Sequence, residues 1–137
     1  MNRPFPAHIH TLEDGLFFLW TWAFQTGGAP EGTPTVTPGQ GDAVMVDELH
    51  VSFDYVRTRL SVQMTLTSDL EALFYRFDYR RDGVLLWRAD CHAGHDAEFG
   101  GPHHLHIGPS EHVREASLAY SLQDISDLVV RTNLSLM

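Results

Sequence analysis

The sequence has one cysteine, no long apolar run and half as many basic as acidic side chains. A single cysteine, Cys91, excludes an intrachain disulfide and fits a reducing compartment. The longest apolar run, Leu16 to Trp20, is far too short to cross a bilayer. The first ten residues lack the apolar segment of a signal peptide. We therefore expect a cytoplasmic chain that makes no membrane contact.

The balance of charge narrows the classes of partner. Nine basic against eighteen acidic side chains give a formal net charge of −9, which excludes a broad basic surface for nucleic acid. Contact with RNA would need a local cluster such as Arg76, Arg80, Arg81 and Arg88. The acidic remainder suits solubility or a basic partner protein. The length of 137 residues predicts a single domain over residues 1–137, and a homo-oligomer is compatible with it.

The first third of the chain predicts one helix and one loop. Thr11 to Asp14 resembles a capping box, and Leu12, Leu16, Trp20 and Phe24 recur every four residues, as on the buried side of a helix. A turn at Asp14-Gly15 followed by a strand is the competing interpretation, and we favour the helix. Residues 26–42 contain five glycines and three prolines, so we expect a loop without regular structure over residues 27–42.

The rest of the chain predicts an antiparallel meander over residues 49–91. Apolar and polar residues alternate in four segments, 49–55, 60–66, 73–80 and 84–91. Asp82-Gly83 joins the last two as a hairpin turn. A second capping box at Ser121 precedes an amphipathic helix over residues 121–132. The predicted fold class is α+β, an antiparallel sheet of about four to five strands with the N-terminal and C-terminal helices packed on one face.

A histidine-rich segment, residues 92–106, holds five of the nine histidines, beside Arg88 and Asp90. Arg88 and Asp90 share one face of their strand. A two-residue hairpin turn would bring Tyr75, Phe77 and Tyr79 to that face, and a three-residue turn would instead place Arg76 opposite Arg88. We favour the two-residue turn. His104 and His106 project to one side if their segment is extended, so we expect them to converge on Arg88 and Asp90.

Several motifs in this region follow one pattern. They are Tyr75-Arg-Phe-Asp-Tyr79, Asp82-Gly83, Leu85-Leu-Trp-Arg88, Asp90, His92, His95 and Gly101-Pro-His-His-Leu-His106. The pattern resembles the TumE family of small bacterial and archaeal proteins, toxins of toxin–antitoxin pairs. The resemblance covers about residues 57–130 and departs at Ala89, Cys91 and Leu105, where the family has an aromatic residue, Asn and Lys. It implies a cognate antitoxin, which we expect to be a helix-turn-helix protein.

One interpretation of the histidines is metal-free cleavage of RNA. Histidine can donate and accept protons near neutral pH, and an arginine can stabilise charge on a phosphate. The expected catalytic residues are Arg88, Asp90, His92, His104 and His106. The expected substrate-binding residues are Tyr75, Arg76, Tyr79, His95 and His103. The plainer interpretation has Arg88 and Asp90 as a cross-strand ion pair beside solvated histidines.

Two further interpretations remain open. His104, His106 and Glu111 have the spacing of the first cupin motif, which suits a zinc or iron site on a small-molecule enzyme, with His92 and His95 as extra ligands. The glycine of that motif is absent, because position 118 is Leu, so we prefer no metal and no cofactor. A non-enzymatic binding module is the third. We expect Cys91, Trp20, Trp22 and Trp87 to be structural. We expect the remaining histidines to lie at the surface, namely His8, His10, His50 and His112.

Overall fold

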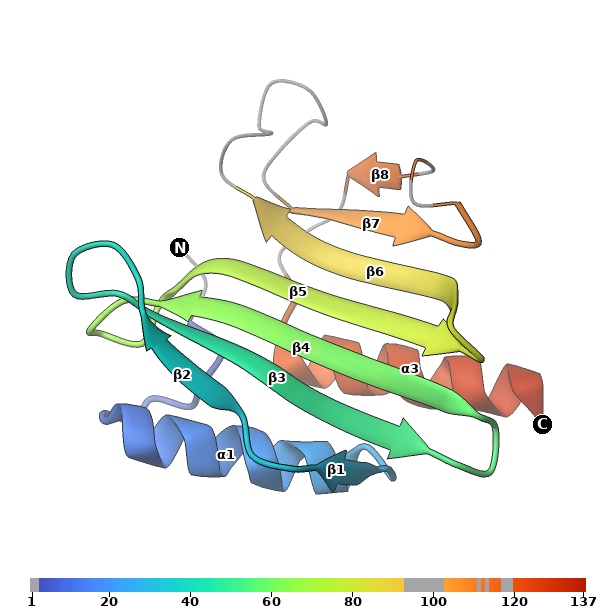
Figure 1. The fold of residues 1–137 in the computed structure, drawn as a ribbon, viewed down its shortest axis with the longest axis horizontal. Coiled ribbons are helices and arrows are strands. Elements are labelled where there is room, and N and C mark those ends of the chain that lie inside the picture. The colour runs from blue at the N-terminus through green and yellow to red at the C-terminus, as the bar shows by residue number, and fades with distance from the viewer. Residues whose placement is uncertain (1–2, 93–102, 111, 113, 117–119) are drawn as a thin grey trace.

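The computed structural model describes residues 3–92, 103–110, 112, 114–116 and 120–137. An antiparallel sheet lies against two helices, α1 and α3, which sit on the same side of it (Figure 1). The helices are α1 (Leu12–Gln25) and α3 (Leu122–Leu136). The strands are β1 (Ala29–Glu31), β2 (Thr35–Pro38), β3 (Val44–Phe53), β4 (Thr58–Leu66), β5 (Ala72–Arg81), β6 (Val84–His92), β7 (His103–Ile107) and β8 (Arg114–Ala116). The predicted α+β class and both helices are confirmed.

The sheet is wider than predicted. Its order among the described residues is β1-β3-β4-β5-β6-β7-β8, and β2 pairs with β3 on the same edge as β1. The prediction of four to five strands was too low because the outer strands are short. β1 and β8 have three residues each and β2 has four, too few for alternation to stand out. The segment 27–42, expected to lack regular structure, therefore contributes two edge strands.

Both helices begin where the sequence predicts. The Thr11 hydroxyl accepts a hydrogen bond from the Asp14 backbone N–H at 3.1 Å. Ser121 and Asp124 form a complete capping box, with bonds of 3.0 and 2.9 Å. α3 runs four residues past its predicted end at residue 132. No helix among the described residues is both long enough and apolar enough to span a bilayer.

The core lies between the two helices and one face of the sheet. β3, β4 and β5 bury alternate apolar side chains there, and the same core includes Leu19 and Trp22 of α1 and Ile125 and Val129 of α3. The Trp22 indole N–H donates to the Leu122 carbonyl at 3.1 Å and ties the helices together. The opposite face of the sheet therefore remains for polar side chains.

Candidate active site

The β5–β6 hairpin decides which side chains reach the polar face. Its turn has two residues, as predicted, because Arg81 pairs with Val84 across it. Asp82 and Gly83 have φ values of 49° and 80°, the positive values that a type I′ turn requires. Beyond the turn, Arg80 pairs with Leu85 but Tyr79 pairs with Trp87. One strand thus carries an extra residue, a β-bulge, which exchanges the two faces of the hairpin.

This exchange corrects the predicted membership of the site. Tyr75, Phe77 and Tyr79, expected beside Arg88 and Asp90, face the helices instead and are buried in the core. Arg76 and Asp78 take their place on the polar face. Arg76 lies opposite Asp90, and Asp78 lies opposite Arg88. Of the expected substrate-binding residues on β5, the structure thus brings Arg76 to the site and leaves Tyr75 and Tyr79 out of it.

Strand β7 completes the cluster by adding two imidazoles to the same face. It pairs antiparallel with β6, so that His106 lies opposite Arg88 and His104 lies opposite Asp90. The two histidines are two residues apart on a strand and therefore point the same way. The predicted convergence of His104 and His106 on Arg88 and Asp90 is confirmed.

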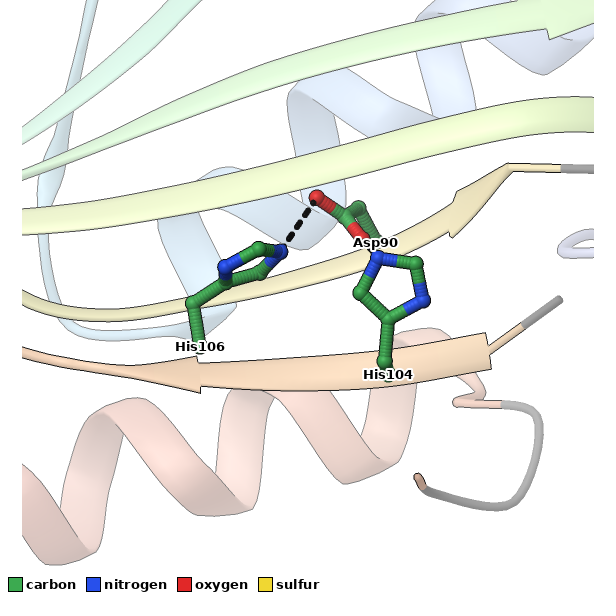
Figure 2. A group of neighbouring side chains, drawn as sticks. All are labelled: Asp90, His104 and His106. Atoms are coloured by element: carbon green, nitrogen blue, oxygen red, sulfur yellow. Dashed lines mark ion pairs between the residues drawn. The ribbon is translucent and has the colours of Figure 1, made fainter. Parts of the chain in front are cut away.

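Asp90 is the centre of this cluster, and Figure 2 shows both imidazole rings turned toward its carboxylate. Its Oδ1 atom lies 2.5 Å from Nε2 of His104, and its Oδ2 atom lies 3.3 Å from Nε2 of His106. The Arg88 Nε–H donates to Oδ2 at 3.3 Å. The two imidazole centroids are 5.1 Å apart. We call Asp90, His104, His106 and Arg88 the Asp90 cluster.

The Asp90 cluster is almost fully enclosed. Asp90, His104 and His106 are each at most 3% exposed, and a charge buried this far must be paired to be tolerated. The Arg76 guanidinium also balances the charge of Asp90, since its Nε lies 3.8 Å from Asp90 Oδ2. The same guanidinium lies over the Phe74 ring, 5.4 Å from the ring centroid. One carboxylate thus orients two groups that can carry protons, beside two guanidiniums that can hold an anion.

His103 belongs to the other face of β7, with Tyr75. Its Nδ1 atom lies 2.8 Å from the Tyr75 hydroxyl, and the two rings stack with centroids 5.7 Å apart. Burial raises the pKa of Tyr75, so its hydroxyl stays protonated as a structural partner. His103 was expected to bind substrate, and the alternation of β7 instead separates it from His104 and His106.

The remaining predicted residues divide into described and undescribed ones. His92 ends β6, opposite Phe74, but its side chain lies outside the described residues, as do His95 and Glu111 entirely. Cys91 is buried, as predicted.

A polar groove extends from the Asp90 cluster across the open face of the sheet. It is a cavity of about 770 Å³, and Arg76 and Arg88 line it while also contacting Asp90. His50 lies in the same groove, where its Nδ1 atom is 2.9 Å from the Ser61 hydroxyl. His50 was expected at the surface, and it lies half-buried on the open face of the sheet, where β4 pairs with its strand and supplies Ser61.

Comparison with known proteins assigns the family. The family model described as Toxin TumE matches residues 35–132, which takes in every strand from β2 to β8 and most of α3. Neither the curated proteins nor the solved structures gave a match. The match agrees with the predicted resemblance, which covered about residues 57–130, and it begins earlier in the chain, at residue 35. A toxin of this family implies an antitoxin as its partner, and α1 lies outside the matched residues. The chain belongs to the TumE toxin family.

Proposed function

We propose that the protein is the toxin of its gene pair and that it acts by cleaving RNA, with the Asp90 cluster as its metal-independent catalytic site. The observation that carries this proposal is the contact of one buried carboxylate with two imidazoles and a guanidinium. A general acid, a general base, an orienting carboxylate and a cation for the phosphate are the groups that such a reaction needs.

The reaction follows from these groups. One histidine removes the proton of a ribose 2′-hydroxyl, and the 2′-oxygen attacks the adjacent phosphorus to form a new P–O2′ bond. The other histidine gives a proton to the 5′-oxygen as the P–O5′ bond breaks. The products are a 2′,3′-cyclic phosphate and a free 5′-hydroxyl. Arg88 stabilises the charge that gathers on the phosphate oxygens, and Asp90 holds both imidazoles in orientation.

Two distances favour acid–base chemistry over a metal. Ligands around a tetrahedral zinc ion sit about 3.3 Å apart, given bonds of about 2.0 Å, whereas Asp90 Oδ1 and His104 Nε2 are 2.5 Å apart. That separation is a direct contact between the imidazole nitrogen and the carboxylate oxygen. In addition, Arg88 and Arg76 lie 3.3 and 3.8 Å from Asp90 Oδ2. Their charge repels a divalent cation and attracts a phosphate.

Toxicity tests the proposal in cells. Expression of the chain in a bacterial host is expected to arrest growth, with loss of cellular RNA. Co-expression of the adjacent gene, which we propose encodes a helix-turn-helix antitoxin, restores growth. Cells that express a His106→Gln variant at the same protein level are expected to grow normally. The His112→Gln variant, which alters an exposed histidine, is expected to remain toxic. Equal toxicity of the His106→Gln variant would contradict the proposed site.

A metal-dependent enzyme is the second candidate, favoured by one observation. Asp90, His104 and His106 each offer a ligand atom, and the three atoms lie within 4.8 Å of one another. Two histidines and a carboxylate are a donor set that zinc and iron accept. Elemental analysis of the purified protein decides the matter. We expect far less than one metal ion per chain. If the protein instead holds zinc or iron at nearly one ion per chain, and a His104→Ala/His106→Ala variant loses it, the metal-dependent function is correct and the metal-independent one is wrong.

A further inference from the structure

We propose that the polar groove binds a single-stranded RNA backbone, so that phosphates flanking the cleaved one rest on Arg59 and Arg80. This inference rests on the proposed function and names the form of its substrate. It starts from the distribution of basic side chains. The sequence contains no lysine, and among the residues that the structure describes, five of the nine arginines line this one groove. They are Arg57, Arg59, Arg76, Arg80 and Arg88.

The groove reaches the Asp90 cluster at Arg88, and Arg76, which also lines it, lies beside Asp90. One row of paired residues crosses the sheet from His50 on β3 through Ser61, Asp78 and Arg88 to His106 on β7. Adjacent strands are about 4.8 Å apart, so this row spans about 19 Å. A stacked strand advances about 3.4 Å per nucleotide, which gives the row room for about five nucleotides, and fewer if the strand is extended. A chain whose phosphate reaches His106 therefore has a floor to lie on.

Two arginines away from the cluster are held by carboxylates, an exposed one on Arg59 and a largely enclosed one on Arg80. Arg59 Nε lies 2.8 Å from Glu31, and Arg80 Nε lies 2.7 Å from Asp78. The Arg59 side chain is 53% exposed and that of Arg80 is 36% exposed. The exposed pair of Arg59 with Glu31 is weak in water. A guanidinium has five N–H donors, so it can bind a phosphate oxygen while keeping or exchanging its carboxylate. These pairs hold both arginines at the groove, whose lining also includes Asp47, Asp54 and Asp82.

The lining of the groove also indicates what it does not recognise. Among the described residues that line it, none is Phe, Tyr or Trp, so it lacks the aromatic surface on which bases stack. Contacts to phosphates position a strand but carry little sequence information. The enclosure of Asp90, His104 and His106 favours a flexible single strand, which can bend a phosphate toward them, over a rigid duplex. We expect the groove to bind with little dependence on sequence.

Binding of 2′-O-methyl RNA tests this inference on the wild-type protein, because that RNA lacks the free 2′-hydroxyl and is not cleaved. Fluorescence anisotropy with labelled oligouridines is expected to show affinity rising from three to six nucleotides and then levelling off. An Arg59→Gln/Arg80→Gln variant is expected to bind the longer strand about 10-fold more weakly. In a plot of log affinity against log salt concentration, the slope of this variant should be about 1.4 shallower than that of the wild type, since each of the two lost phosphate contacts contributes about 0.7.

The control is Arg131→Gln, which removes one positive charge, against two in the groove variant, from the exposed surface of α3 on the helix side of the sheet. It is expected to bind as the wild type does, and circular dichroism is expected to show all variants folded. Unchanged affinity of the Arg59→Gln/Arg80→Gln variant, or equal binding of a duplex, would overturn the inference. If binding behaves as expected but unmodified RNA is not cleaved, only the proposed function fails. If RNA is cleaved but the Arg59→Gln/Arg80→Gln variant binds as the wild type does, only the inference about the groove fails.

Discussion

Replacing His106 with glutamine is expected to slow RNA cleavage by about 100- to 10,000-fold, the range that general acid–base catalysis supplies. Glutamine can still contact Asp90 through its amide, but it cannot exchange a proton near neutral pH. His104→Gln is expected to cause a loss of similar size, because His104 is held by the same carboxylate at 2.5 Å. The rate is measured on a labelled single-stranded RNA in the presence of a chelator.

A substrate with a better leaving group separates the roles of the two histidines. In an RNA with sulfur in place of the bridging 5′-oxygen, the leaving thiolate needs no proton. The variant that lacks the general acid should regain most of its rate on this RNA, and the variant that lacks the base should not. His112→Gln serves as the control, because His112 is exposed, and it should cleave at the wild-type rate. If His106→Gln and His104→Gln both keep that rate, the Asp90 cluster is not catalytic.

The second large effect concerns stability. Replacing Asp90 with alanine is expected to lower the free energy of unfolding by about 3 to 5 kcal/mol, the cost of removing one partner from a buried charged group. Asp90 contacts His104, His106 and Arg88, and all four groups are largely enclosed. Without the carboxylate, the Arg88 guanidinium keeps its charge with less to balance it. Urea denaturation monitored by tryptophan fluorescence gives the value.

An exposed ion pair provides the comparison for that measurement. Glu31→Ala removes the carboxylate that pairs with Arg59, where both side chains are about half exposed. Such a pair contributes at most about 1 kcal/mol, so this variant should unfold near the wild-type midpoint. A loss for Asp90→Ala no larger than that for Glu31→Ala would show that the cluster contributes little to the fold. The proposal that Asp90 holds both imidazoles in place would then fail.

The sequence predicted the long elements because each repeats its pattern several times. Both helices have capping residues at Thr11 and Ser121, and the four central strands alternate over at least seven residues. The Asp82-Gly83 turn was also predictable, since few residue pairs accept two positive φ values. The edge strands were missed for the opposite reason: three or four residues hold too little pattern, and pairing with a neighbour decides whether they form.

The membership of the site was harder to predict than its position. Arg88, Asp90, His104 and His106 were predicted to meet, because alternation on two strands fixes their faces. The bulge between β5 and β6 has no local signal in the sequence, yet it decides that Arg76 and not Tyr75 joins them. His103 shows the same limit, since one residue of displacement along β7 changes the face. The place of His50 in the groove became clear only through the pairing of β3 with β4.

The central claim is that the Asp90 cluster cleaves RNA through the 2′-hydroxyl without a metal. The most direct test treats a single-stranded RNA, and the same strand with 2′-deoxyribose at every position, with wild-type protein and excess chelator. We predict that the RNA is cut to fragments ending in 2′,3′-cyclic phosphate and 5′-hydroxyl, and that the deoxy strand stays intact. Cleavage of both strands, or activity that disappears with the chelator, would contradict the account.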